Sequence, residues 1–333
     1  MENAIAQLEE PVAPLISEYK QLLSNTPELT EKQLNRLNAL KMEIQEKLRE
    51  RYKSVTAWER VCLARHPERP QTLDFINYLT QGNFLELHGD RLFGDDPAVI
   101  AGFGKLDKHQ VCIVGTQKGK NLKEKQFRNF GMASPEGYRK ANRVFKLAEK
   151  YRLPVITLVD TPGAFPGIGA EERGQAEAIA RSIYTMLSLN VPTIAVIIGE
   201  GGSGGAIALA TSDIILMLEN AWLSVISPEA CSSILWRDSS HKEQSAEALK
   251  LTSHQLLSYG LIDDIVKEPP PGAHLFRDEV MSTTREKILY YINELKSLSS
   301  SEMLKRRHSK YASMGVFLVE KNELLHNIAQ KQN

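Results

Sequence analysis

Five glycines within seven residues form the part of this sequence best suited to chemistry. Residues 199–205 read GEGGSGG, with only Glu200 and Ser203 between the glycines. Glycine has no side chain and adopts positive φ angles, so such a turn can direct successive backbone N–H groups toward a ligand. At the beginning of a helix these N–H groups have no partner within the helix, and they suit an anion or an oxyanion. The segment therefore predicts a binding turn made of backbone donors.

Three interpretations fit this segment, and the glycines alone do not separate them. Residues 199–204 fit the G-x-G-x-x-G of a dinucleotide-binding dehydrogenase, but roughly eight residues separate Gly205 from the next predicted strand, too few for the usual crossover helix. Residues 201–205 fit the G-x-S-x-G turn of a hydrolase with Ser203 as nucleophile. The third interpretation is a purely structural tight turn. The hydrolase needs an acid and a histidine downstream, and the candidates are His241, His254, His274, Asp263 and Asp264.

Strands and helices alternate around this turn. Residues 193–198 are short, apolar and bounded by proline and glycine, which predicts a buried strand, and residues 206–210 predict the start of a close-packed helix. Residues 155–159 predict the preceding strand, which ends in another glycine-rich turn at residues 160–167. Such alternation indicates parallel pairing, and ligands bind at the carboxyl ends of parallel strands. We therefore expect both turns at one edge of the sheet.

The remaining pattern predicts an α/β core between two helical extensions. Further strands are predicted at residues 99–106, 111–116, 214–218, 223–226 and 262–266. Further helices are predicted at residues 134–151, 171–189, 245–251 and 254–259. We expect an N-terminal helical extension (residues 1–55), a core (56–275) and a C-terminal helical arm (276–333) with a loose hinge at 297–301.

Local signals mark two helix starts and one basic loop. Thr30 with Gln33 and Thr56 with Glu59 have the spacing of capping boxes. The loop after the strand at 111–116 predicts either a solvated face or a site for phosphates or an acidic partner. Its basic residues are Lys118, Lys120, Lys123, Lys125 and Arg128.

Composition excludes several classes of protein. Among 333 residues, 41 are Lys or Arg and 41 are Asp or Glu, and this balance argues against nucleic-acid or membrane-surface binding. Cys62, Cys112 and Cys231 are widely spaced, so we expect no metal site and a reducing compartment. Neither a secretory signal nor an apolar run of spanning length is present. We therefore expect a soluble intracellular protein.

One tetrapeptide bears on biotin. Residues 39–42, ALKM, are similar to the segment that carries covalently attached biotin in carrier proteins. That lysine belongs at a hairpin tip, whereas Lys41 lies in the middle of a predicted helix. We therefore expect no cofactor to be bound covalently by this chain.

Extended blocks around the two turns resemble the alpha subunit of the bacterial and plastid acetyl-CoA carboxylase carboxyltransferase. The resemblance follows the expected order across roughly residues 55–275, and its blocks are more specific than the glycines alone. The blocks are residues 64–70, 128–132, 135–141, 160–164, 169–175, 199–206 and 227–229.

The resemblance implies a crotonase-like fold of stacked ββα units whose paired turns form oxyanion holes. It implies transfer of a carboxyl group from carboxybiotin to acetyl-CoA, giving malonyl-CoA, the first committed step of fatty acid biosynthesis. At matching positions it assigns the oxyanion donors to Gly204, Gly205 and Ala206. Gly201 and Gly202 would shape this turn, and Gly163 with Ala164 would form the neighbouring wall of the carboxybiotin side.

The same resemblance implies partners. A beta subunit would supply the thioester side of the site in an assembly of two alpha and two beta chains, and zinc would belong to that beta subunit. A biotin carboxyl carrier protein would deliver carboxybiotin, and a separate biotin carboxylase would use ATP to form it. The chain alone would be inactive, and the compartment would be the bacterial cytosol or the plastid stroma.

Overall fold

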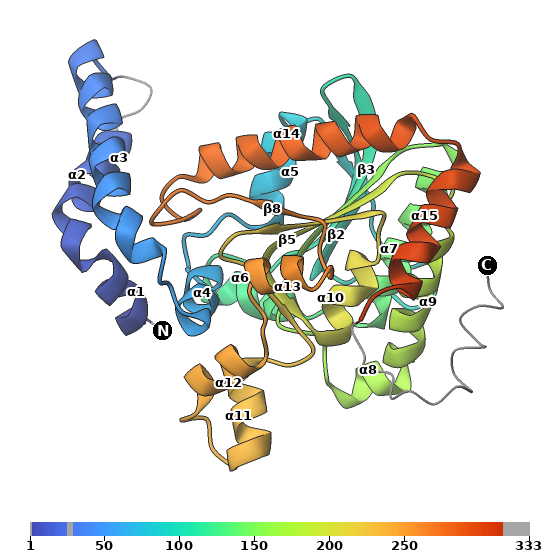
Figure 1. Ribbon diagram of the computed structural model, residues 1–333. Helices are drawn as coiled ribbons and strands as arrows, with labels where there is room; N and C mark the ends of the chain where they lie inside the picture. Colours follow the sequence, from blue (N-terminus) through green and yellow to red (C-terminus); the bar gives the residue numbers. More distant parts are fainter. Residues whose placement is uncertain (1, 25–28, 316–333) are drawn as a thin grey trace, which may run out of the picture.

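The computed structural model describes residues 2–24 and 29–315. Within these residues the core is an eight-stranded sheet in the order β1-β2-β3-β4-β5-β6-β8, with β7 paired to β5. Figure 1 shows this sheet in the middle of the molecule. The strands are β1 (Phe84–Glu86), β2 (Val99–Leu106), β3 (His109–Thr116), β4 (Val155–Thr161), β5 (Thr193–Gly202), β6 (Ile214–Leu218), β7 (Trp222–Ser224) and β8 (Asp264–Val266).

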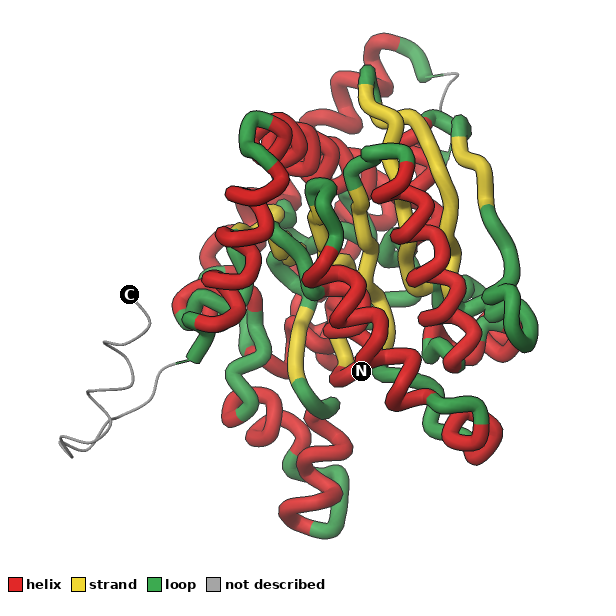
Figure 2. The backbone as a smooth tube through the Cα atoms, turned by 90° about the vertical axis from the view of Figure 1, so that its right-hand side faces the viewer, coloured by secondary structure: helices red, strands yellow, loops and turns green. Residues whose placement is uncertain are grey.

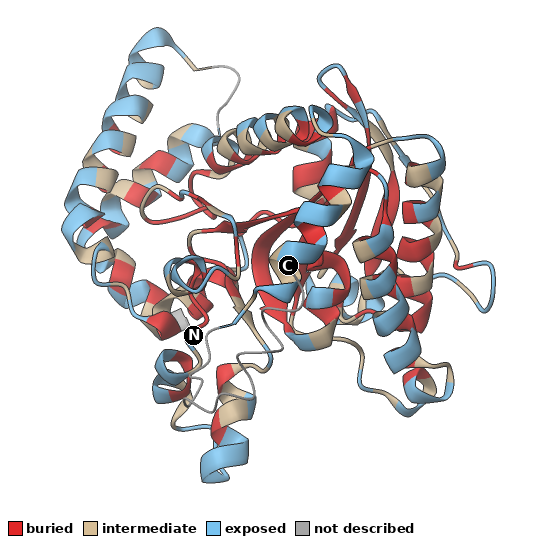
Figure 3. Ribbon diagram, turned by 45° about the vertical axis from the view of Figure 1, so that its right-hand side comes forward, coloured by how far each residue is buried: buried red, intermediate tan, exposed pale blue. Residues whose placement is uncertain are grey.

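Parallel pairing joins β3 through β6 and β8, while β1, β2 and β3 pair antiparallel. Every residue of β4, β5 and β6 is buried (Figure 3), because helices cover both faces of the sheet. One face carries α7 (Pro135–Lys150), α9 (Gln175–Ser188) and α10 (Ser203–Ala210), and the other carries α5 (Thr72–Thr80) and α14 (Arg277–Lys296), as Figures 1 and 2 show. The predicted α/β class and parallel pairing are confirmed.

Within the described residues, five helices precede the first strand of the sheet. Before α5 come α1 (Glu2–Glu9), α2 (Ala13–Leu23), α3 (Glu31–Tyr52) and α4 (Ala57–Ala64), with a 3-10 turn at Glu10–Val12. Both predicted capping boxes are present, at Thr30 with Gln33 and at Thr56 with Glu59. Helices α2 and α3 pack on each other and stand beside the sheet (Figure 1). Their buried contacts include Phe276, which lies just before α14.

The C-terminal helices α14 and α15 (Ser300–Ala312) belong to the main core. Ile288 and Ile292 of α14 are fully buried against the sheet residues. Where a loose hinge was expected, Ser299 forms a capping box with Glu302 and starts α15. The division at residues 55 and 275 stays a prediction, and apolar contacts cross both positions. The predicted helical arm from residue 316 onward lies outside the described residues.

Two predicted elements around the glycine turns have different bounds in the structure. The helix predicted at 171–189 is interrupted: α8 (Ile168–Glu172) and α9 are separated by Gly174, whose φ of 82° no regular helix adopts. The strand predicted at 193–198 continues to Gly202, because Glu200, Gly201 and Gly202 pair with β7. The helix predicted from residue 206 begins at Ser203.

The other predicted strands and helices are present with small shifts at their ends. The strands at 99–106 and 214–218 are confirmed as β2 and β6. The helices predicted at 245–251 and 254–259 correspond to α12 (Lys242–Ala248) and α13 (Ser253–Ser258). Sequence reasoning missed α5, β1, α6 (Leu122–Phe127), the 3-10 turn Asn129–Gly131 and α11 (Pro228–Trp236).

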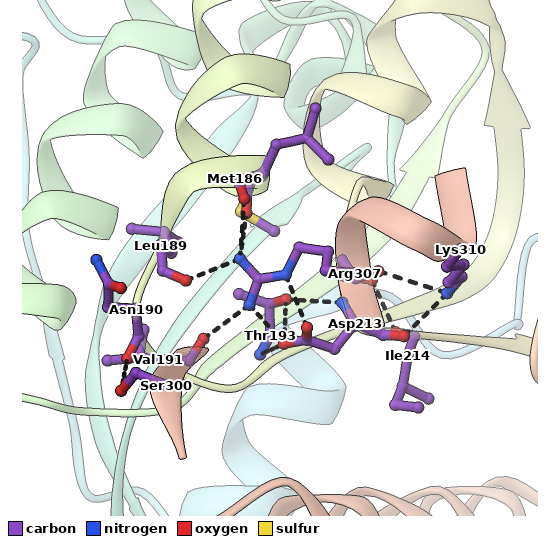
Figure 4. A network of polar contacts seen from close by, with 12 residues as sticks. Met186, Leu189, Asn190, Val191, Thr193, Asp213, Ile214, Ser300, Arg307 and Lys310 are labelled. Atoms are coloured by element: carbon purple, nitrogen blue, oxygen red, sulfur yellow. Dashed lines mark hydrogen bonds and ion pairs between the residues drawn. The ribbon is translucent and has the colours of Figure 1, made fainter. Parts of the chain in front are cut away.

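A buried arginine fastens α15 to the core (Figure 4). The side chain of Arg307 is fully buried and donates to both carboxylate oxygens of Asp213, at 2.7 and 2.6 Å. It also donates to the carbonyl oxygens of Met186 and Leu189 at 2.8 Å and of Val191 at 3.1 Å. One guanidinium therefore joins α15 to the end of α9 and to the loop segments that precede β5 and β6.

Two stacked histidines lie beyond α4. The rings of His66 and His274 are 4.0 Å apart, and His274 Nε2 lies 2.7 Å from Glu9 Oε1. The backbone N–H of Glu68 donates to Nδ1 of His66 at 3.1 Å, which requires that nitrogen to be unprotonated. Burial, with His274 beside it, lowers the pKa of His66 to about 4.

We expect acidification to about pH 5 to destabilise the wild-type chain more than a His66→Asn variant, by about 1–2 kcal/mol. Unfolded His66 takes up its proton near pH 6.5 and folded His66 only near pH 4. Between about pH 6.5 and about pH 4 the unfolded chain binds more protons at His66 than the folded chain does. The contribution of His66 to the free energy of unfolding is therefore fully present above pH 6.5 and falls as the pH drops through this range. Urea denaturation at about pH 7.5 and about pH 5 measures the difference. An identical pH dependence in both proteins would contradict the prediction.

No helix in residues 2–24 and 29–315 is both long and apolar enough to cross a bilayer. The three cysteines are free thiols, and the same residues hold no group of three or more His, Cys, Asp or Glu side chains arranged for a metal ion.

Candidate active site

The two glycine-rich turns lie side by side at the carboxyl ends of neighbouring strands. Strand β4 ends at Thr161, which pairs with Gly201 of β5. The residues that follow, 162–164 and 202–205, are called here the β4 turn and the β5 turn. The predicted meeting of both turns at one edge of the sheet is confirmed, since the strands are parallel and adjacent.

The β5 turn is the N-terminus of α10, and no side chain caps it. Gly202 occupies the N-cap position, so the N–H groups of Ser203, Gly204 and Gly205 fall in the first turn, where a helix offers them no partner. Ala206 is the fourth helical residue, and a helix pairs that N–H with the carbonyl of its N-cap. Of the three donors predicted from sequence, helix geometry thus favours Gly204 and Gly205 over Ala206.

Close packing between the turns explains two of the glycines. A Cβ on Gly202 would lie 2.1 Å from the carbonyl oxygen of Pro162. A Cβ on Gly205 would lie 2.6 Å from the carbonyl carbon of Gly163 and 2.7 Å from the nitrogen of Ala164. These atoms belong to the backbone and cannot rotate away, so the β5 turn can rest on the β4 turn only without side chains at these positions.

The predicted site residues differ in accessibility. Gly201, Gly202, Gly205 and Ala206 are buried, whereas Gly163, Ala164 and Gly204 are half-buried. The N–H of Gly163 already donates to Thr161 Oγ1 at 3.1 Å. A ligand that approaches from solvent therefore meets Gly204 and Ala164 first, while the buried members hold the turns in place.

Ser203 has a left-handed φ of 51° and is exposed between strand and helix, as a hydrolase nucleophile would be. The candidate bases are engaged elsewhere: His254 contacts Glu219, His274 contacts Glu9, and His241 contacts Ser240. None of these three histidine contacts involves the Ser203 hydroxyl. The geometry thus lacks the serine–histidine pair that a hydrolase needs.

A buried network of charges lies directly behind the two turns. Lys118 Nζ is 2.6 Å from Asp160 Oδ1 and 2.5 Å from Glu200 Oε2. Arg65 contacts the other oxygen of Glu200 at 2.6 Å and reaches Glu229, the second residue of α11, at 2.5 Å. Sequence reasoning missed this network, although one acidic residue near the end of each of two adjacent strands was the available signal.

These contacts keep the glutamate ionised. Burial opposes the charge on Glu200, but Lys118 and Arg65 outweigh burial and lower its pKa to about 2. Burial likewise opposes the charge on Lys118, but Asp160 and Glu200 outweigh it and raise the pKa of the ammonium. Glu200 is therefore a poor general base at neutral pH, and the site's chemistry depends on backbone donors and fixed charges.

The predicted basic loop at 118–128 divides into two kinds of residue. Lys118 points inward to the network, which excludes it from a surface phosphate site. Lys120 is exposed and paired with Asp74, and Lys123 is exposed on α6. The choice between a solvated face and a site for phosphates or an acidic partner stays open for these two.

An apolar groove of about 480 Å³ adjoins the β5 turn on the outer side of α10. Its walls include Ser203 and Gly204 at one end and Ile207, Leu223 and Val225 beyond them. Of the candidate donor residues, Gly204 lines this cavity, which suits a small ring system or an alkyl chain.

The sheet with its two glycine-rich turns has the crotonase-like fold of carboxyltransferase domains. The transcarboxylase 12S structure superposes with a TM-score of 0.54 and 18% identity over 76% of this chain and 44% of that chain. The geranyl-CoA carboxylase beta subunit of P. aeruginosa gives 0.52 and 16% over 81% of this chain and 48% of that chain. The chain thus spans less than half the length of these two proteins, and at such identity the likeness concerns the fold alone.

Sequence relatives identify the family. The family model described as acetyl co-enzyme A carboxylase carboxyltransferase-like matches residues 2–315. The acetyl-coenzyme A carboxylase carboxyl transferase subunit alpha of Carboxydothermus hydrogenoformans is 50% identical over 96% of this chain and 99% of its own length. That of Flavobacterium psychrophilum is 57% identical over 80% of this chain and 84% of its own. The chain belongs to this alpha-subunit family, and its function is that of a carboxyltransferase subunit of acetyl-CoA carboxylase, a biotin-dependent enzyme.

Proposed function

We propose that the β4 and β5 turns form the carboxybiotin side of a shared active site that carboxylates acetyl-CoA to malonyl-CoA. The observation that carries this proposal is the uncapped, solvent-accessible N-terminus of α10 packed against the β4 turn. Its donors are Gly204 and Gly205, with Ala206 next along the helix, and Gly163 with Ala164 forms the facing wall. Gly201 and Gly202 place this helix at the end of β5.

The residues present fit carboxybiotin as a substrate. Its ureido ring and alkyl arm match the apolar groove beside Gly204, and its oxygens match the free N–H groups. When bound, carboxybiotin supplies CO₂, and negative charge develops on the ureido oxygen. Fixed N–H donors at that oxygen stabilise the charge by about 3 kcal/mol each without reorganisation.

In this proposal a partner subunit binds acetyl-CoA, the acceptor of the carboxyl group. Removal of a methyl proton from the acetyl thioester creates an enolate, whose carbon forms the new bond to CO₂, and the proton passes to biotin. Such an enolate needs its own oxyanion donors, which we assign to a beta subunit in an assembly of two alpha and two beta chains. Zinc is assigned to that subunit, while a carrier protein and a biotin carboxylase supply carboxybiotin. The two sequence relatives named above are bacterial, which supports the bacterial cytosol as the compartment.

The test is malonyl-CoA formation from acetyl-CoA and carboxybiotin, with the chain alone and with a purified beta-type partner. We expect turnover only in the mixture. Turnover by the chain alone would exclude the shared site. A stable complex without turnover would favour an assembly subunit with no catalytic part.

Ser203→Ala is expected to lower turnover of the assembled enzyme by less than about tenfold, because the backbone N–H remains. A serine hydrolase would lose at least about a thousandfold when its nucleophile is removed. Initial rates of malonyl-CoA formation and of acetyl-CoA hydrolysis distinguish the two. Loss of both activities would restore the hydrolase interpretation.

A further inference from the structure

The spacing of the β4 and β5 turns depends on what holds the two strand ends together. Asp160 lies two residues before the β4 turn and Glu200 two residues before the β5 turn. Asp160 Oδ1 accepts the backbone N–H of Glu200 at 2.9 Å, so the acidic side chain of one strand already contacts the backbone of the other. A Cβ on Gly199 would lie 2.4 Å from the same oxygen, which shows how little room this contact leaves.

Two buried carboxylates this close repel each other unless a cation lies between them. The ammonium of Lys118 occupies that position, at 2.6 Å from Asp160 and 2.5 Å from Glu200. The exposed fractions of these three side chains are 15%, 6% and 8%. Solvent therefore screens the contact little, and the cation attracts both strand ends toward one point.

The lysine itself is held firmly. A Cβ on Gly131 would lie 2.8 Å from Lys118 Cγ, so the side-chain stem packs against the 3-10 turn at Asn129–Gly131. From the other direction, Arg65 contacts Glu200 and Glu229, which fixes the second oxygen of the glutamate. The ion pairs of Lys118 with Asp160 and Glu200 are therefore supported by the 3-10 turn on one side and by Arg65 and α11 on the other.

We propose that Lys118 is a positioning residue for carboxyl transfer, because its ammonium bridges Asp160 and Glu200 and thereby sets the spacing of the β4 and β5 turns. Lys118 acts through the two carboxylates, and Gly204 and Ala164 meet the substrate. This inference rests on the proposed function, which assigns the reacting oxygen to these turns.

A purely structural ion pair makes a different prediction. Loss of such a pair lowers the stability of the chain, and the molecules that remain folded turn over normally. Loss of a positioning residue lowers kcat in the folded, assembled enzyme, because a misplacement of about 1 Å costs about a hundredfold in rate. The KM for acetyl-CoA, which binds the partner, stays the same in that case.

The experiment compares Lys118→Met, Lys118→Arg and Lys47→Met in the enzyme assembled with its partner. Lys47 is also paired with a carboxylate, that of Glu43, but its side chain is 50% exposed and lies on α3 outside the two turns, which makes it the matched control. We expect Lys118→Met to lower kcat about a hundredfold with KM for acetyl-CoA within about twofold of wild type. Lys118→Arg should recover most of the rate, and Lys47→Met should equal wild type.

A charge-balanced variant covers the case in which Lys118→Met does not fold. Lys118→Met with Asp160→Asn removes one charge of each sign and keeps an acceptor oxygen for the N–H of Glu200. Its kcat is also expected to fall about a hundredfold, since the bridge is absent. Wild-type kcat in either folded variant would overturn the inference. The wild-type assembly separates this outcome from failure of the proposed function. If the proposed function were wrong, the wild-type assembly itself would form no malonyl-CoA.

Discussion

Gly205→Val is expected to lower malonyl-CoA formation by at least about a hundredfold while the chain still associates with its partner. A Cβ at this position would lie 2.6 Å from the carbonyl carbon of Gly163 and 2.7 Å from the nitrogen of Ala164. Valine adds two further methyl groups, so the β5 turn must move away from the β4 turn. The N–H donors then no longer point to the position where the charge develops.

Gly94→Val is the matched control, since a Cβ on Gly94 has no atom within 4 Å. Rates are measured on complexes isolated by size-exclusion chromatography, which separates loss of chemistry from loss of assembly. The two substitutions should differ by at least about a hundredfold in kcat. Near-wild-type turnover of Gly205→Val would show that close contact between the turns is unnecessary for the reaction.

Arg307→Ala is expected to lower the free energy of unfolding by about 3–5 kcal/mol. The substitution leaves the carboxylate of Asp213 buried without its cation. It also leaves the carbonyl oxygens of Met186, Leu189 and Val191 without the guanidinium that they contact. Each of these losses carries a desolvation cost that alanine cannot offset.

The adjacent Arg306 provides the control. Its side chain is 56% exposed and pairs with Glu294, so Arg306→Ala should cost less than about 1 kcal/mol. Urea denaturation of the isolated chain, followed by circular dichroism, measures both variants. If the two substitutions had equal effects, the buried contacts of Arg307 would not be the reason for its importance.

The layout of the site could be predicted because it depends on short-range signals. Apolar runs located β4 and β5, and the glycine turns at their ends marked the ligand-binding edge. The extent of β5 could not be predicted in this way. Glycine disfavours strands, and only pairing with β7, which lies farther along the chain, extends β5 to Gly202.

The charged network behind the turns could not be predicted from local sequence patterns. Asp160 and Glu200 are 40 residues apart in sequence, and Lys118 and Glu200 are 82 residues apart. The parallel pairing of three strands brings them together. In the sequence Lys118 looks the same as Lys120 and Lys123, although only Lys118 turns inward. The burial of Arg307 could not be predicted for a similar reason. Its helix, α15, is polar in composition, and charged side chains on such helices are usually exposed.

The ion pair between Arg307 and Asp213 also limits when the core can be completed during protein synthesis. The two residues are 94 positions apart. At a translation rate of about 5–20 residues per second, Asp213 is made about 5–20 seconds before its cation. The nascent chain can pair its strands during this interval, but the segment before β6 and the end of α9 have no guanidinium to join them. This part of the core can therefore be completed only after α15 has been translated, and a chain truncated before Arg307 would leave the carboxylate of Asp213 without its cation.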